Sequence, residues 1–170
     1  QENNWKITAE EFDNAMTGST KMIIINSPNN PTGAVYTREE LAAIGEVAAS
    51  EDILILSDEI YEKLIYGESE HVSIGSISEE IQKLTITING FSKAYAMTGF
   101  RLGYMAGPSW LIDQADKLQQ QSATCVCDFA QNGALAALNG QQDCVQQMRD
   151  TYSHRKELMM NAFNNISFLK

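Results

Sequence analysis

Residues 84–93 read LTITINGFSK, in which a short run of alternating apolar and β-branched residues passes directly into a polar cluster. Two earlier segments have the same form, MIIINSPNNPTG at residues 22–33 and ILILSDEIY at residues 53–61. Each apolar run is too short for a helix and is followed by turn residues, which predicts a strand. The continuous runs of the two earlier segments are typical of strands buried on both faces of a sheet. Residues 102–107, stopped by Pro108, form a fourth candidate strand.

Helical patterns fill the stretches between and after these strands. Thr37 with Glu40 forms a capping box ahead of an expected helix over about residues 38–50. Three more helices are expected, one opening at Pro108-Ser109, one over about residues 130–138 and one over about residues 143–163. The order of elements predicts an α/β domain with a mostly parallel sheet. The link from the third strand to the fourth is too short for a helical crossover, so we expect the fourth strand to run antiparallel.

The composition describes an acidic globular chain. It has 170 residues, with 12 Lys and Arg against 22 Asp and Glu, and a formal net charge of −10. This length fits one domain, and the acidic excess argues against a nucleic-acid partner because phosphate backbones attract basic surfaces. No apolar run approaches the roughly 20 residues that span a bilayer, so no membrane partner is expected.

The first residues and the cysteines lead to further expectations. The segment from Gln1 to Trp5 has no signal-peptide pattern, and the absence of an initiator Met suggests a piece of a longer chain. Cys125, Cys127 and Cys144 are odd in number, and their C-x-C spacing fits neither a disulfide framework nor a common zinc site. We therefore expect reduced thiols, a cytoplasmic location and no bound metal.

Polar side chains follow three of the predicted strands at the point where each strand ends. Ligands of open α/β sheets bind at the carboxyl ends of the strands, where these side chains would converge if the strands are neighbours. Arg101 lies eight residues after the last of them, just before the fourth strand. Singly, each of these residues is most often a turn, cap or surface residue, so it is the joint order that carries weight. The candidate residues at the strand ends are Asn30, Asp58, Tyr61, Ser92 and Lys93.

This set of side chains matches the chemistry of pyridoxal phosphate better than that of a nucleotide. A lysine beside apolar residues loses its proton more easily than in water, and the neutral amine forms a Schiff base with a carbonyl. A carboxylate can keep a pyridinium nitrogen protonated, and an arginine can bind a phosphate with two N–H groups. Asn amides and Tyr hydroxyls can donate to a phenolate oxygen. The sequence contains neither a G-x-G-x-x-G motif nor a Walker-type loop.

Three stretches together resemble the class I/II aminotransferases of fold type I, and in particular their bacterial aspartate aminotransferase subgroup. Residues 26–33 and 57–61 are similar to the family's N-x-P-N-N-P-T-G and D-E-I-Y stretches. Residues 90–103, GFSKAYAMTGFRLG, resemble the long and specific pyridoxal-attachment signature. The resemblance extends from Trp5 over essentially the whole chain. Two positions depart from it: many members have Ser in place of Gly90, and many read Ser-Asn-Pro near residues 124–127, which bears on substrate choice.

The resemblance implies a role for each candidate residue. Lys93 would form the aldimine with pyridoxal 5′-phosphate and then move a proton between the substrate and the cofactor. Asp58 would keep the pyridine nitrogen protonated. Asn30 and Tyr61 would bind the phenolic oxygen, which lowers the pKa of the aldimine.

The resemblance further implies that Ser92 and Arg101 bind the phosphate, with Arg101 as the main charge partner. The fold implied is the three-layer large domain of a PLP-dependent transferase, incomplete here. Residues 1–150 would be part of that large PLP-binding domain, and residues 151–170 would start the helix that links it to a small domain. The implied substrates are an aspartate-like amino acid and a 2-oxo acid, and the implied parent enzyme is a homodimer.

Two other functions are compatible with the same residues. A PLP-dependent C–S β-lyase of this fold would use the same Lys, Asp, Tyr and Arg. A non-catalytic effector domain of a transcription regulator would retain the fold and bind the cofactor. If the longer protein is an aminotransferase, these 170 residues alone are expected to transaminate poorly or not at all, because groups outside them contribute to positioning.

Overall fold

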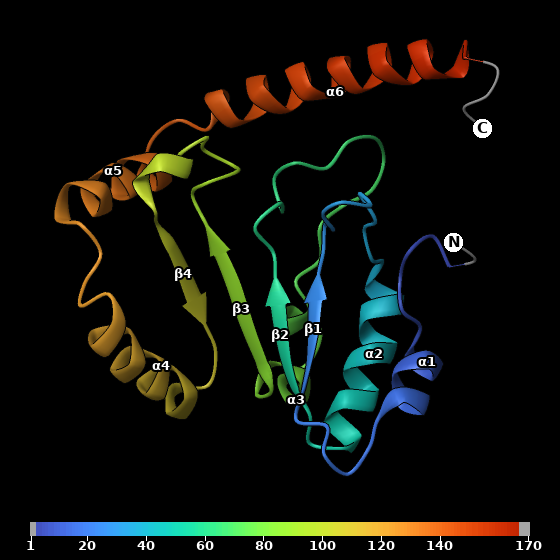
Figure 1. Ribbon diagram of the computed structural model, residues 1–170, viewed down its shortest axis with the longest axis vertical. Coiled ribbons are helices and arrows are strands. Elements are labelled where there is room, and N and C mark those ends of the chain that lie inside the picture. The colour runs from blue at the N-terminus through green and yellow to red at the C-terminus, as the bar shows by residue number, and fades with distance from the viewer. Residues whose placement is uncertain (1–2, 167–170) are drawn as a thin grey trace.

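A four-stranded mixed sheet forms the centre of the computed structural model, which describes residues 3–166. The strands lie side by side in chain order, β1-β2-β3-β4 (Figure 1). β1 pairs in parallel with β2, and β2 in parallel with β3, whereas β3 and β4 are antiparallel. This confirms the α/β class, the mostly parallel sheet and the antiparallel fourth strand. The strand bounds are β1 Met22–Asn26, β2 Leu54–Asp58, β3 Thr85–Gly90 and β4 Gly103–Ala106.

All of the predicted helices are present, and two short helices were not predicted. The capping box of Thr37 and Glu40 is formed at the start of α2. The unpredicted helix α1 begins with the same device, in which Thr8 and Glu11 cap each other, so its signal was present in the sequence. The helices are α1 Ala9–Ala15, α2 Arg38–Ser50, α3 Glu79–Gln82, α4 Ser109–Ser122, α5 Asp128–Asn139 and α6 Asp143–Asn164, with 3-10 turns η1 Ile74–Ser76 and η2 Thr98–Phe100.

The main core lies between one face of the sheet and α1, α2 and α3. Ile23 and Ile25 of β1 and Ile55 of β2 are buried against Leu41 and other apolar residues of α2. The prediction that β1 is buried on both faces is wrong for the described residues, because Ile24 on the opposite face is 70% exposed. Burial instead alternates along β1 and β2, as in strands covered on one side only.

A second core cluster joins α5 to the end of β3 and the start of β4. Phe91, which follows β3, and Leu102, which precedes β4, pack against Ala130 and Ala134 of α5. Gly90 lies where the backbones of β3 and β4 approach closely. A Cβ atom there would be 2.9 Å from the carbonyl oxygen of Leu102. In this chain, the close backbone approach leaves no free space for a Cβ atom at the position.

The last helix crosses the edge of the sheet at which β1, β2 and β3 end (Figure 1). α6 runs without interruption from Asp143 to Asn164, so the domain boundary predicted between residues 150 and 151 falls inside this helix. The end of the predicted linking helix, residues 167–170, lies outside the described residues. Among residues 3–166, no helix is both long and apolar enough to cross a membrane.

Candidate functional site

The loops after β1 and β2 meet at the carboxyl edge of the sheet. The side-chain amide of Asn30 donates a hydrogen bond of 3.1 Å to the hydroxyl of Tyr61. Asn26, the last residue of β1, supports this contact, because its Oδ1 accepts from the backbone N–H of Asn30 at 3.0 Å. The amide of Asn26 also donates to the backbone carbonyl of Asp58 at 3.1 Å. The ends of two parallel strands are therefore joined directly, as their neighbouring positions in the sheet require.

Lys93 reaches the same place from the end of β3. Its Nζ lies 5.3 Å from the centroid of the Tyr61 ring, within the range of a cation–π interaction. The Lys93 side chain is half-buried, whereas an isolated surface lysine would be fully hydrated. Three side chains from three successive strand ends, Asn30, Tyr61 and Lys93, are thus brought together as the sequence predicted.

These residues line a cavity of about 890 Å³ at the carboxyl edge of the sheet. Ser92 lies in its wall beside Lys93, and α6 contributes Tyr152 and Lys156. None of the described residues that line this cavity is acidic. A chain of net charge −10 therefore presents two lysines and no carboxylate to this space, which suits an anionic ligand.

A second tyrosine of the same loop stands in the cavity wall. Nζ of Lys156 lies 5.8 Å from the centroid of the Tyr66 ring, so each of the two lysines lies over a tyrosine. Burial raises the pKa of Tyr66, and the nearby Tyr152 adds to the effect. The Tyr66 phenol is therefore neutral at ordinary pH and does not cancel the charge of Lys156.

Two of the predicted site residues do not line this cavity. Asp58, at the end of β2, is half-buried, and its Oδ1 accepts a hydrogen bond of 3.2 Å from the N–H of Ile60. Arg101 is exposed and donates to the carbonyl of Thr98 at 2.9 Å. It lines a different cavity, of about 500 Å³, between β3, β4 and α4. The structure thus brings Asn30, Tyr61, Ser92 and Lys93 to one cavity and leaves Asp58 and Arg101 outside its lining. The predicted roles of all six residues stay predictions.

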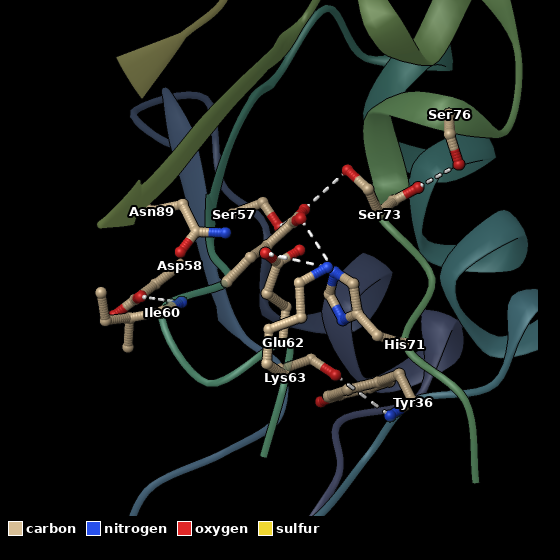
Figure 2. Close-up of polar contacts among 12 residues, drawn as sticks. Tyr36, Ser57, Asp58, Ile60, Glu62, Lys63, His71, Ser73, Ser76 and Asn89 are labelled. Carbon is tan, nitrogen blue, oxygen red and sulfur yellow. Dashed lines mark hydrogen bonds and ion pairs between the residues drawn. The ribbon is translucent and has the colours of Figure 1, made fainter. Parts of the chain in front are cut away.

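Sequence reasoning missed a buried carboxylate next to this site. Glu59 is only 3% exposed, and its oxygens accept hydrogen bonds from Ser57, His71 and Ser73. Figure 2 shows the side chains of Ser57, His71 and Ser73 gathered around one point beside Asp58. The sequence pattern that could have identified Glu59 is the alternation of side chains along β2. This alternation puts residue 59 on the same inward face as Ile55 and Ser57. A carboxylate on a buried face requires hydrogen-bond donors, and the sequence supplies them nearby.

Glu62 lies close to this network. The ligand-type atoms of Glu59, Glu62 and His71 all lie within 4.8 Å of one another. Both Glu59 oxygens already accept hydrogen bonds from protein groups, so we describe the cluster as a hydrogen-bond network rather than a metal site. Cys125, Cys127 and Cys144 are free and exposed in the structure, and their redox state stays a prediction.

Comparison with known proteins gives a consistent result over the whole chain. The family model described as "Aminotransferase class I and II" matches residues 1–169. The aspartate aminotransferase of Bacillus sp. (strain YM-2) is 51% identical over 169 residues, which are 99% of this chain and 43% of that protein. The aspartate aminotransferase of Bacillus subtilis (strain 168) is 49% identical over 155 residues, which are 91% of this chain and 39% of that protein.

A solved structure of similar fold is the aspartate aminotransferase of Thermus thermophilus with maleate. It superposes with a TM-score of 0.91 at 39% sequence identity, over 96% of this chain and 42% of that one. The chain therefore spans about two fifths of the length of the proteins that it matches.

Proposed function

This chain belongs to the class I and II aminotransferases, and we propose from this premise that it carries the pyridoxal-phosphate site of an aspartate-like aminotransferase. The observation that supports this most directly is the meeting of Asn30, Tyr61 and Lys93 at one edge of the sheet. These three residues come from three separate stretches that the family resemblance singles out. Their convergence is what a ligand contacted by all three requires.

The donor set fits the cofactor. Lys93 offers an amine, while Asn30 and Tyr61 offer an amide and a hydroxyl that lie 3.1 Å apart and can contact the same oxygen atom. The cavity they line has lysines but no acidic residue among its described lining, which suits the phosphate of the cofactor. When bound, pyridoxal phosphate supplies an electrophilic carbon for amines and a ring that withdraws electrons.

In the proposed site, Lys93 would hold the cofactor through its amine and, once that amine is free, would take up the proton from the substrate Cα. Asp58 would keep the ring nitrogen protonated, because a carboxylate beside a pyridine stabilises its protonated form. Asn30 and Tyr61 would donate hydrogen bonds to the phenolic oxygen and so favour its charged form.

The phosphate is assigned to Ser92 and Arg101. Ser92 lies in the cavity wall beside Lys93 and can donate its hydroxyl. Arg101 is retained in the proposal because a guanidinium has five N–H donors, and the hydrogen bond to Thr98 uses only Nη1. Arg101 lines two other cavities, and Lys93 lines neither of them.

The substrate class is proposed from the relatives. The two Bacillus proteins are named as aspartate aminotransferases, and the Thermus thermophilus structure contains maleate, a dicarboxylate. We therefore propose transfer between an aspartate-like amino acid and a 2-oxo acid. We also propose that residues 1–150 are part of a larger cofactor-binding domain, and that the longer protein acts as a homodimer in the cytoplasm.

A single experiment tests the assignment of Lys93. The full-length protein is mixed with pyridoxal phosphate, reduced with borohydride to fix the cofactor to the amine that binds it, and digested for peptide mass analysis. We expect the added mass on the peptide that contains Lys93, and its loss in a Lys93→Ala variant. Added mass on another lysine, or no added mass, would contradict the proposed function.

A further inference from the structure

The turn after β2 begins with a residue that is anchored twice through its backbone. The N–H of Glu59 donates to the carbonyl of Ile88 in β3 at 2.9 Å, which continues the pairing of β2 with β3. The carbonyl of Glu59 accepts from the N–H of Glu62 at 2.9 Å. These two bonds define a tight turn over residues 59–62, and Tyr61 is its third residue. Any displacement of Glu59 therefore moves Tyr61.

The side chain of Glu59 ties this turn to the far end of the loop. Oε1 accepts from Ser57 Oγ at 2.9 Å and from Ser73 Oγ at 2.7 Å, and Oε2 lies 2.9 Å from Nε2 of His71. His71 and Ser73 come at the end of the loop that starts with the turn, so the carboxylate closes the loop on itself. We call Ser57, Glu59, His71 and Ser73 the Glu59 network.

The carboxylate of Glu59 is the shared centre of this network. It is 3% exposed, and Ser57, His71 and Ser73 all lie within hydrogen-bond distance of its two oxygens. Hydrogen bonds to a charged acceptor are stronger than those to a neutral one. Loss of the carboxylate charge would weaken all three bonds together.

We propose that Glu59 is a positioning residue for Tyr61, acting through the Glu59 network. The network fixes the turn, and the turn fixes the Tyr61 hydroxyl at 3.1 Å from the amide of Asn30. A shift of the turn would break this contact and misplace the hydroxyl that acts on the phenolic oxygen. This inference rests on the proposed function, because its consequence for the reaction requires the cofactor at that edge of the sheet.

The test replaces Glu59 by Gln in the full-length protein with its cofactor. The amide keeps the shape of the side chain but loses the charge and places an NH₂ group among donors. We expect kcat/KM for aspartate with 2-oxoglutarate to fall roughly 10- to 100-fold, as for other small misplacements of reacting groups. We also expect the pH midpoint of the visible absorption of the bound cofactor to rise, as in Tyr61→Phe, because both changes weaken the same contact.

Three more variants keep the test decisive if Glu59→Gln folds poorly. Ser73→Ala removes one donor and retains the carboxylate, so we expect a smaller shift of the absorption midpoint in the same direction, which Ser73→Thr should reverse. Ser76→Ala is the matched control, because the exposed Ser76 donates to the Ser73 carbonyl and does not contact Glu59. It should leave both readouts unchanged.

The outcomes separate this inference from the proposed function. The first outcome concerns a wild-type protein that carries the cofactor on Lys93. If the Glu59 and Ser73 variants then lose only thermal stability, and kcat/KM and the absorption midpoint stay unchanged, the positioning role is refuted. If the wild-type protein takes up no cofactor at all, the proposed function fails and this inference fails with it.

Discussion

The amide of Asn30 donates a hydrogen bond of 3.1 Å to the hydroxyl of Tyr61, and this contact joins the loops that follow two parallel strands. Asn30 is exposed and Tyr61 is half-buried, so the bond is accessible from the cavity. A neutral hydrogen bond that is open to water contributes little net stability, because water can replace either partner. The proposed function assigns this contact to a ligand rather than to the support of the fold, and this assignment can be tested.

Replacing Tyr61 by Phe tests this explanation. The variant loses the hydroxyl but keeps the ring beneath Lys93. We expect the free energy of unfolding to change by less than about 0.5 kcal/mol. The pH midpoint of the cofactor absorption, which reports the protonation of the aldimine, should rise by roughly one unit. The reason is that the charged phenolic oxygen of the cofactor loses one hydrogen bond. A spectrophotometric titration of the full-length protein measures this, and an unchanged midpoint would remove Tyr61 from the site.

Two substitutions of Arg101 separate the effect of its strained backbone from the effect of its charge. Its backbone is left-handed, with φ 54° and ψ 45°, which is unfavourable for any residue with a Cβ atom. Both Arg101→Ala and Arg101→Gly remove the guanidinium, but only the second relieves the strain. We expect the Gly variant to be more stable than the Ala variant by about 1 kcal/mol in urea unfolding.

Cofactor affinity should respond differently to the same two substitutions. If Arg101 binds the phosphate, both variants should bind pyridoxal phosphate more weakly than the wild type and to a similar extent, whereas Arg101→Lys should retain part of the affinity. Wild-type affinity in the Ala and Gly variants would show that Arg101 serves only the neighbouring cavity.

The strand ends were predictable because their signals are local. Each apolar run stops at turn residues, and parallel neighbours bring successive stops to the same edge, which places Asn30, Tyr61 and Lys93 together. The direction of β4 was also predictable, since a short link between Gly90 and Gly103 leaves no room for a crossover helix.

Other features depend on contacts that no local pattern encodes. The isoleucine run of β1 reads the same whether one face or two are covered, so the exposure of Ile24 could not be predicted from it. The pairing of Glu59 with His71 depends on the path of the loop between them. The location of Arg101 could not be predicted from a local pattern either. Its backbone is left-handed, and its side chain lines a cavity that Lys93 does not line.

Gly90 provides a test of the close approach between β3 and β4. A serine there would place its Cβ 2.9 Å from the Leu102 carbonyl oxygen and 3.0 Å from the Cα of Gly103, and both of these are backbone atoms that cannot rotate away. We expect Gly90→Ser to lower the free energy of unfolding by roughly 1–3 kcal/mol. Gly18→Ser is the control, because a Cβ at Gly18 meets no atom within 4 Å. Equal stability of the two variants would show that β4 moves aside freely.

Glu40 provides a test of pH-dependent stability outside the site. Its carboxylate accepts hydrogen bonds from Lys6 Nζ at 2.6 Å and from the N–H of Thr37 at 2.8 Å. Burial alone would raise the pKa of Glu40, but the hydrogen bonds from Lys6 and Thr37 and the charge of Lys6 together hold it below its ordinary value of 4.5. The unfolded chain therefore binds a proton at this carboxyl before the folded chain does.

It follows that the stabilisation from Glu40 is fully present above pH 4.5 and is lost as the pH falls through the lower, folded-state pKa. Urea midpoints measured between about pH 6 and about pH 3 should decline more steeply for the wild type than for Glu40→Gln, and the two curves should approach each other at the acid end. Glu46→Gln, an exposed substitution on the same helix, is the control and should follow the wild-type curve. Parallel curves for wild type and Glu40→Gln would show that the bonds from Lys6 and Thr37 do not distinguish the charged carboxylate from a neutral amide.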